Sequence, residues 1–183
     1  MTDPTPQPAL RAYDERDLDH LVAVNDAAYP AVPITPAAEL AELIGISSVV
    51  VVVDDGSASG FVLGMPPGLE YQSENYRYFT SRARELGTSF VYVDRIVLAA
   101  HLRGRGIGPR LYAAVFAEAR RVGADEVLCE VNVEPPNPGS LAFHRRLGFV
   151  EVGRQSTKGG ANLVALLAAP VRATAELPQS SRE

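Results

Sequence analysis

The segment that decides the fold is IVLAAHLRGRGIGPRLY, from Ile96 to Tyr112. A β-branched strand ends in it, glycines follow at three alternate positions (Gly104, Gly106 and Gly108), and a helix is expected to begin at Pro109. Glycine lets the backbone take a positive φ and approach a ligand closely. A strand-to-helix turn also directs backbone N–H groups and the positive end of the helix dipole at one point. The segment therefore predicts a site for a phosphate or diphosphate.

Two common phosphate-binding motifs do not fit this turn. The dinucleotide fingerprint G-x-G-x-x-G would need a glycine where the chain has Pro109. A P-loop needs four residues between its glycines and then Gly-Lys-Ser/Thr, and neither feature is present. Arg103 and Arg105 add local positive charge to a chain with a formal net charge of −5. The alternative is a tight turn that binds nothing, although each glycine costs roughly 0.5–1 kcal/mol relative to alanine.

Hydrophobic periodicity around this turn predicts alternating strands and helices. In chain order, the expected elements are a strand at 9–13, a helix from 18, a helix at 36–45, a hairpin around 55–56, a strand at 90–98, a helix at 109–122, a strand at 126–131, a helix at 137–147, and strands at 150–155 and 163–167. Hairpin and crossover connections occur together in this pattern. The sequence therefore predicts an α/β (α+β layered) domain with a mixed sheet.

Composition and charge narrow the class of protein. Residues 1–7 are expected to be a disordered leader, 8–171 a single domain, and 172–183 a disordered tail. We expect a cytoplasmic protein without a membrane span, because no apolar run is long enough. The single cysteine, outside any Cys/His cluster, argues against a disulfide and against a metal site. The acidic balance argues against nucleic acid as a partner, although RGRGIGPR and HRRLG are locally basic.

A second motif, NPGSLAFHRRLGFVEVG, runs from Asn137 to Gly153. In it an asparagine opens a helix that ends in Leu-Gly-Phe and leads into a strand. Together with the form Arg103-x-x-Gly106-x-Gly108 upstream, this motif resembles the signatures of the GCN5-related N-acetyltransferase (GNAT) superfamily. The resemblance covers about residues 9–170 and is firmest over 90–153.

The resemblance implies a GNAT-like acyl-CoA N-acyltransferase fold, with a mixed, mostly antiparallel sheet of about seven strands and about four flanking helices. Its fourth and fifth strands would separate, and the pantetheine of coenzyme A would pair with the fourth strand in the gap. Asn137 would hydrogen-bond the cofactor, or would simply cap its helix. The residues implied for acetyl-CoA binding are Ile96, Val97, Leu98, Arg103, Gly104, Arg105, Gly106, Ile107, Gly108 and Asn137.

Acetyl transfer to an amine needs an unprotonated nucleophile, a polarised carbonyl and a proton for the departing thiolate. Family members often carry a tyrosine as the acid on the helix that an asparagine initiates, and the matching position here holds His144. Imidazole has a reference pKa of about 6.5, against about 10 for tyrosine, so it can donate or accept a proton near neutrality. The alternative is that His144 only packs or hydrogen-bonds on its helix.

The base has two candidates. Side chains alternate along the strand at 126–131, so Cys129 is expected to fill the core and Glu130 to face the other side. A core cysteine favours direct transfer in a ternary complex. Glu130 stands where some family members keep a glutamate base. Asp94 is the rival, although burial of its charge would require a partner such as Arg95. A water relay without a single base is equally compatible with the family.

The acceptor is the least specified part. The segment 66–89 is rich in aromatic and charged residues and is expected to be a functional loop with a short helix. Family acceptor pockets are often lined from this region, so Tyr76 and Tyr78 are expected to bind the acceptor; the alternative is that the rings cover the core. Asn132, on the same strand face as Glu130, is also expected to bind the acceptor.

The expected function is N-acetylation of a small-molecule or protein amine, by a monomer or a homodimer. A coenzyme A-binding sensor or scaffold without turnover is the alternative, because the usual tyrosine is absent.

Overall fold

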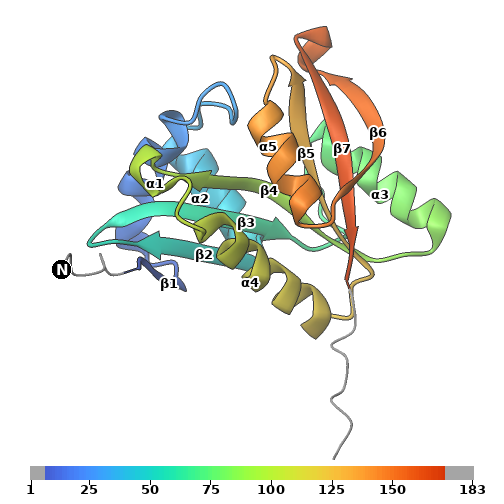
Figure 1. The fold of residues 1–183 in the computed structure, drawn as a ribbon. Helices are drawn as coiled ribbons and strands as arrows, with labels where there is room; N and C mark the ends of the chain where they lie inside the picture. Colours follow the sequence, from blue (N-terminus) through green and yellow to red (C-terminus); the bar gives the residue numbers. More distant parts are fainter. Residues whose placement is uncertain (1–6, 172–183) are drawn as a thin grey trace, which may run out of the picture.

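The computed structural model describes residues 7–171 (Figure 1). The predicted tail at 172–183 and all but Gln7 of the predicted leader lie outside the described residues. The elements are β1 (Ala9–Ala12), η1 (Glu15–Asp17), α1 (Leu18–Asp26), α2 (Ala37–Ile46), β2 (Val49–Asp54), β3 (Ala58–Met65), α3 (Glu74–Leu86), β4 (Phe90–Leu98), η2 (Ala100–Leu102), α4 (Ile107–Arg121), β5 (Glu126–Glu134), α5 (Pro138–Arg146), β6 (Val150–Thr157), η3 (Lys158–Gly160) and β7 (Asn162–Pro170).

The predicted order of strands and helices is confirmed, with two differences in helix length. The segment expected to be mainly a loop contains α3, a helix of 13 residues that Ser73 caps through its side chain and Gly87 ends in the left-handed conformation. Helix α4 begins at Ile107, two residues before the expected start, because Gly106 adopts a φ of 75° and serves as its N-cap. No helix within residues 7–171 is long and apolar enough to cross a membrane.

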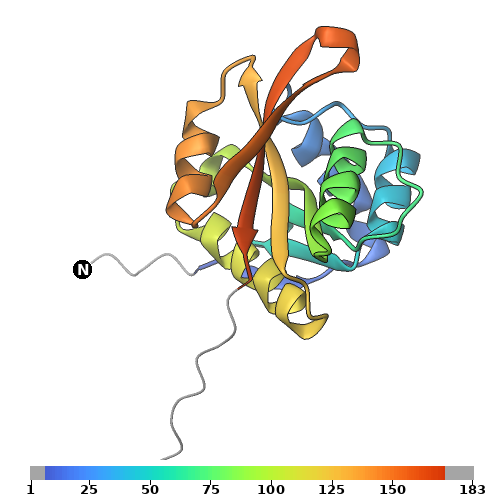
Figure 2. The ribbon, with the colours of Figure 1, turned by 90° about the vertical axis from the view of Figure 1, so that its right-hand side faces the viewer.

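The seven strands form one sheet in the order β1-β2-β3-β4-β5-β7-β6. All neighbours are antiparallel except β4 and β5, which are parallel, so the expected mixed and mostly antiparallel sheet is confirmed. Helices cover both faces of this sheet, five α-helices in the described residues against about four expected from the family pattern. Figure 2 shows α3 and α5 on opposite sides of β5 and β7.

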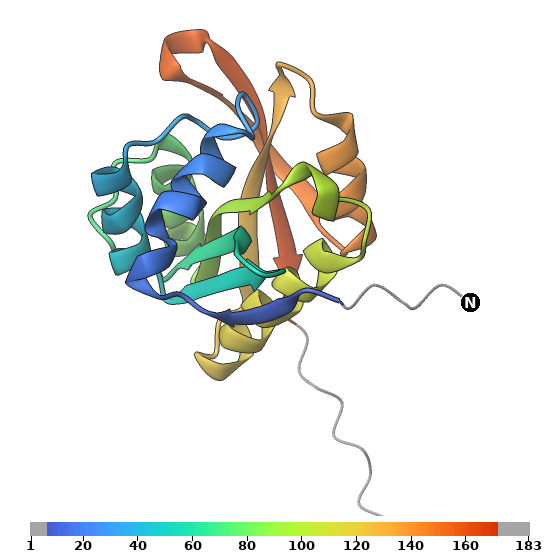
Figure 3. The same ribbon diagram turned by 90° about the vertical axis from the view of Figure 1, so that its left-hand side faces the viewer.

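Side chains that alternate along the strands pack into two separate hydrophobic cores, one on each face of the sheet. One core lies under α1, α2 and α3 and contains Leu21, Leu40 and Phe79. The other lies under α4 and contains Leu111 and Val115. Figure 3 shows α1 and α2 on one side of the molecule and α5 on the other. The sheet is therefore a rigid layer between two apolar cores, and it holds the ends of its strands in fixed positions.

The parallel pair β4–β5 is joined only at its beginning. The register pairs Phe90, Val91 and Tyr92 with three residues of β5 that end at Leu128, and no pairing follows although both strands continue. Beyond this point β4 remains paired with β3, and β5 remains paired with β7. The two halves of the sheet therefore diverge (Figure 1), and the edge of β4 that faces β5 is open from Val93 onward.

Helices α4 and α5 approach each other at Gly108. A Cβ atom on Gly108 would lie 2.9 Å from Cζ of Phe143, which is on α5. Unlike Gly104 and Gly106, Gly108 has no positive φ. The third glycine of the turn therefore serves helix packing, a role that the sequence pattern did not indicate.

We expect Gly108→Ala to lower the free energy of unfolding by about 1–2 kcal/mol, because the added methyl group displaces Phe143 from a packed position. Gly45→Ala is the matched control, since Gly45 is also helical and its Cβ would meet nothing within 4 Å; this variant should gain roughly 0.5–1 kcal/mol. Urea denaturation of both variants checks the pair. Equal stability of the two variants would contradict the proposed contact.

Candidate functional site

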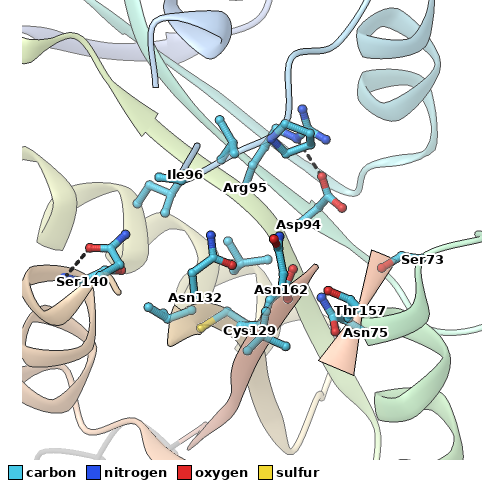
Figure 4. Close-up of a pocket in the computed structure, with 18 of the residues that line it drawn as sticks. Ser73, Asn75, Asp94, Arg95, Ile96, Cys129, Asn132, Ser140, Thr157 and Asn162 are labelled. Atoms are coloured by element: carbon cyan, nitrogen blue, oxygen red, sulfur yellow. Dashed lines mark hydrogen bonds and ion pairs between the residues drawn. The ribbon is translucent and has the colours of Figure 1, made fainter. Parts of the chain in front are cut away.

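A cavity of about 370 Å³ lies where β4 and β5 separate. Figure 4 shows side chains from both strands, and from the helices beside them, directed into this space. Its walls also include the loop before α2 and the β6–β7 turn. The principal lining residues are Pro30, Ala31, Val32, Pro33, Tyr71, Asn75, Val93, Asp94, Arg95, Ile96, Tyr112, Cys129, Glu130, Val131, Asn132, Asn137, Ser140, His144, Lys158 and Asn162.

Glu130 lies in this cavity, on β5 just after the strands part. The hydroxyl of Tyr92 donates to its carboxylate, at 3.0 Å from Oε1 and 2.9 Å from Oε2. Burial raises the pKa of Glu130 to about 8, and the negative charge of Asp94 acts in the same direction. The side chain nevertheless keeps partial exposure to the cavity. Glu130 is therefore a reachable carboxyl that changes protonation close to neutral pH.

Asp94 has a different environment, although it lies in the same cavity. Its carboxylate accepts a hydrogen bond from the Tyr71 hydroxyl at 2.7 Å and pairs with Nε of Arg95 at 2.8 Å. Its side chain is only 6% exposed. The ion pair that the sequence offered as an alternative reading is present, and it compensates the burial of the charge. Asp94 is therefore held between two donors, whereas Glu130 accepts from the Tyr92 hydroxyl and forms no salt bridge within residues 7–171.

Arg95 also holds one wall of the cavity. Its Nη1 atom donates to Oδ1 of Asn25 and to Oγ1 of Thr35, both at 3.0 Å. Asn25 in turn donates to the carbonyl of Pro33 at 2.9 Å. On the other side of the gap, Nδ2 of Asn132 lies 3.3 Å from the carbonyl of Pro30. The loop at 30–33 is therefore linked to β4 through Asn25 and Arg95, and to β5 through Asn132 across the cavity.

His144 lies in the wall of the cavity and is 3% exposed. Its Nε2 atom is 2.7 Å from the hydroxyl of Tyr112, and its Nδ1 atom is 2.8 Å from the carbonyl oxygen of Ser140. Burial lowers the pKa of His144, so the ring is neutral near pH 7. Cys129 is 3% exposed and belongs to the core under α4, and burial raises the pKa of its thiol. Cys129 therefore has the surroundings expected of a core residue.

The glycine-rich turn between β4 and α4 is exposed and contains two glycines in the left-handed conformation. Gly104 and Gly106 have φ values of 74° and 75°, and residues 103–106 are exposed. Within residues 7–171, no backbone carbonyl accepts a hydrogen bond from the N–H groups of residues 104–106. Arg103 extends back along the turn and its Nε donates to the carbonyl of Leu98 at 3.2 Å. The turn therefore presents free donors beside the open edge of β4.

The residues predicted to pair with pantetheine lie on the open part of β4. Ile96 lines the cavity, Val97 is buried and Leu98 is half-buried at the end of the strand. Asn137 also lines the cavity, and its Oδ1 accepts a hydrogen bond from the backbone N–H of Ser140 at 3.2 Å. The amide of Asn137 thus caps α5 through its oxygen and keeps its nitrogen as a donor, so capping does not exclude ligand binding.

The structure does not bring Tyr76 and Tyr78 into the cavity. Tyr76 is 1% exposed, and its hydroxyl donates to the carbonyl of Pro66 at 2.8 Å. The hydroxyl of Tyr78 donates to the carbonyl of Val152 at 3.3 Å. The reason is that α3 is a full amphipathic helix, which turns these rings toward the core and the sheet. Tyr71, just before the helix, is the aromatic residue from this segment that lines the cavity.

Sequence reasoning did not connect three tyrosines with the predicted catalytic side chains that they contact. Tyr71 bonds Asp94, Tyr92 bonds Glu130, and Tyr112 bonds His144. The alternation of Tyr92 and Asp94 along one strand was a usable signal, since it places both on one face. Tyr112 gave no such signal, because it and His144 lie on different helices and are 32 residues apart in the sequence.

Comparison with known proteins relates this chain to a family of acetyltransferases. The model of the acetyltransferase (GNAT) family matches residues 10–149. No curated protein matches this chain in sequence. Ard1 from Thermoplasma volcanium superposes with a TM-score of 0.71 at 15% identity, over 92% of this chain and 100% of that chain.

Two further solved structures contain coenzyme A groups. The yncA protein from Salmonella typhimurium, solved with acetyl-CoA, has a TM-score of 0.63 at 18% identity. The superposition covers 95% of this chain and 99% of the yncA chain. Arabidopsis thaliana Naa50, in complex with the bisubstrate analogue CoA-Ac-MVNAL, has a TM-score of 0.65 at 15% identity, with 89% and 98% covered. At these identities the likeness shows the fold alone.

The raised pKa of Glu130 predicts a pH-dependent stability. Its carboxyl binds a proton more tightly in the folded protein than in the unfolded chain, so it destabilises the folded state increasingly as pH rises from its ordinary value near 4.5 to about 8. Relative to wild type, Glu130→Gln should therefore gain unfolding free energy between about pH 5 and about pH 9.

Glu118→Gln is the control for this measurement, because Arg121 holds the pKa of Glu118 below its usual value and any effect has the opposite sign. Urea titrations across the pH range measure both. A difference between Glu130→Gln and wild type that is independent of pH would show that the carboxyl titrates normally.

Proposed function

Because the chain belongs to the acetyltransferase (GNAT) family, we propose that it transfers an acetyl group from acetyl-coenzyme A to an amine. The observation that carries this proposal is the separation of β4 from β5 over a cavity that contains a titratable carboxyl. The open edge supplies backbone groups for a linear amide-bearing ligand, and the cavity supplies groups that can handle a proton.

The donor would lie along β4 and end at the glycine-rich turn. Residues 96–98 would pair with the pantetheine amides as an added strand does. Residues 103–108 would hold the diphosphate through free N–H groups, the first turn of α4 and the charge of Arg103 and Arg105. Asn137 would contribute its amide nitrogen from the facing wall.

Glu130 would act as the general base in direct transfer. The amine nitrogen attacks the thioester carbon, and its proton passes to the Glu130 carboxylate, directly or through one water. A pKa of about 8 leaves a useful fraction of carboxylate near neutrality and makes that carboxylate more basic than an ordinary one. Asp94, compensated by Arg95 and Tyr71, would act by keeping that pKa high. A covalent acetyl-cysteine is disfavoured, because the raised pKa of Cys129 suppresses the thiolate.

The acceptor would be a polar amine of a small molecule or a peptide, which attacks in its unprotonated form. Asn75, Asn132 and Asn162 contribute polar groups to the cavity, whereas Tyr71 is its single ring from the aromatic segment at 66–89. The Naa50 complex with a peptide-bearing analogue is consistent with a peptide N-terminus as one such amine.

We expect the turnover of wild type to rise with pH through a midpoint near 8, because the base works only when it is deprotonated. Glu130→Gln should lower kcat about a hundredfold and remove this rise, with little change in KM for acetyl-CoA. Thiol release over a panel of amines measures both effects. Glu118→Gln, on α4 but not among the lining residues of the cavity, should behave as wild type.

Wild-type kcat in Glu130→Gln would exclude Glu130 as the base. If coenzyme A raised the melting temperature while no amine gave thiol release, the protein would be a binding module rather than an enzyme.

A further inference from the structure

Tyr112 and His144 form a hydrogen-bonded pair whose direction can be deduced. The carbonyl of Ser140, 2.8 Å from Nδ1 of His144, can only accept, so Nδ1 carries a proton. Because the buried ring is neutral, Nε2 is then bare and is an acceptor. The Tyr112 hydroxyl, 2.7 Å away, is therefore the donor to Nε2.

His144 has no nitrogen left for a ligand. Both ring nitrogens are engaged, and the ring is enclosed edge-on by three aromatic neighbours at centroid distances of 5.4 Å (Tyr112), 5.1 Å (Phe143) and 5.3 Å (Phe149). A direct proton transfer from His144 to a substrate would have to break the bond to Tyr112. By contrast, the hydrogen of the Tyr112 hydroxyl can rotate away from Nε2 without movement of either ring, and Tyr112 is a lining residue of the cavity.

We propose that the Tyr112 hydroxyl is the hydrogen-bond donor to the sulfur that leaves acetyl-coenzyme A, and that His144 is the residue that positions it. This inference rests on the proposed acetyl transfer. It moves the role that the family assigns to a tyrosine on the asparagine-initiated helix to a tyrosine on α4, the helix that follows the glycine-rich turn.

The amine nitrogen bonds to the thioester carbon and gives its proton to Glu130, the carbon–sulfur bond breaks, and its electron pair stays on sulfur. The Tyr112 O–H then turns from Nε2 of His144 to the sulfur, because a hydrogen bond to an anion is roughly twice as strong as one between neutral groups. Tyr112 keeps its proton, since burial holds its pKa well above the ordinary value. The thiolate takes a proton from water after release.

The test measures the thiol of bound coenzyme A, without turnover. A donor beside the sulfur stabilises the thiolate and lowers the pKa of that thiol. The thiolate absorbance of coenzyme A bound to wild type should therefore titrate about one pH unit below its titration in Tyr112→Phe. Turnover of Tyr112→Phe should fall about tenfold or more, with KM for acetyl-CoA nearly unchanged. Tyr13→Phe, a half-buried tyrosine outside the cavity, should match wild type in both measurements.

Two variants separate the role of His144 from packing. His144→Gln keeps an acceptor for the Tyr112 hydroxyl, and His144→Phe removes it. The bound thiol should titrate nearer the wild-type pH in His144→Gln than in His144→Phe. Identical titrations in these two variants would remove the positioning role.

The results that would overturn the proposal differ from those that would overturn the function. If coenzyme A binds and its thiol titrates identically with Tyr or Phe at position 112, the donor role falls while acetyl transfer stands. If Tyr112→Phe does not fold, the His144 variants still decide: a bound thiol that titrates identically in wild type, His144→Gln and His144→Phe contradicts a donor positioned by His144. Failure of wild type to bind coenzyme A would overturn the proposed function itself.

Discussion

The separation of β4 from β5 after three paired residues is the constraint on which the rest of the structure depends. Each strand keeps its other neighbour, so the sheet divides into two halves that share one end. A continued ladder would have closed the gap and left Asp94, Arg95 and Glu130 inside a sheet. The separation converts these polar side chains into the lining of a cavity and leaves one edge of β4 with unused backbone groups.

Asp94 and Glu130 show how the neighbours of a carboxyl group in the cavity decide its role. Asp94 has a guanidinium and a phenol as donors, so its negative charge is compensated. Glu130 has the hydroxyl of Tyr92 and lies close to the charge of Asp94, which with burial raises its pKa to about 8. Asp94 therefore serves as a structural, paired charge, whereas Glu130 can exchange a proton near neutral pH.

The sequence predicted most of the fold and part of the site. The limits of β4 at 90–98 were obtained exactly from β-branched periodicity, and the glycine-rich turn was recognised because positive φ leaves a direct mark on residue choice. Tyr76 and Tyr78 were expected in the acceptor site because composition does not reveal which face of a helix is buried until its length is known. The Tyr112–His144 pair could not be predicted, since it depends on how α4 crosses α5 at Gly108.

Hydrogen exchange of the backbone amides with and without coenzyme A shows whether the open edge of β4 and the glycine-rich turn hold the cofactor, since both would bind it through backbone groups. The account predicts that coenzyme A slows exchange at the open edge of β4, from Val93 to Leu98, and in the turn from Gly104 to Gly108, while β1 and β2 are unaffected. Saturating coenzyme A that leaves exchange in both segments unchanged would contradict it.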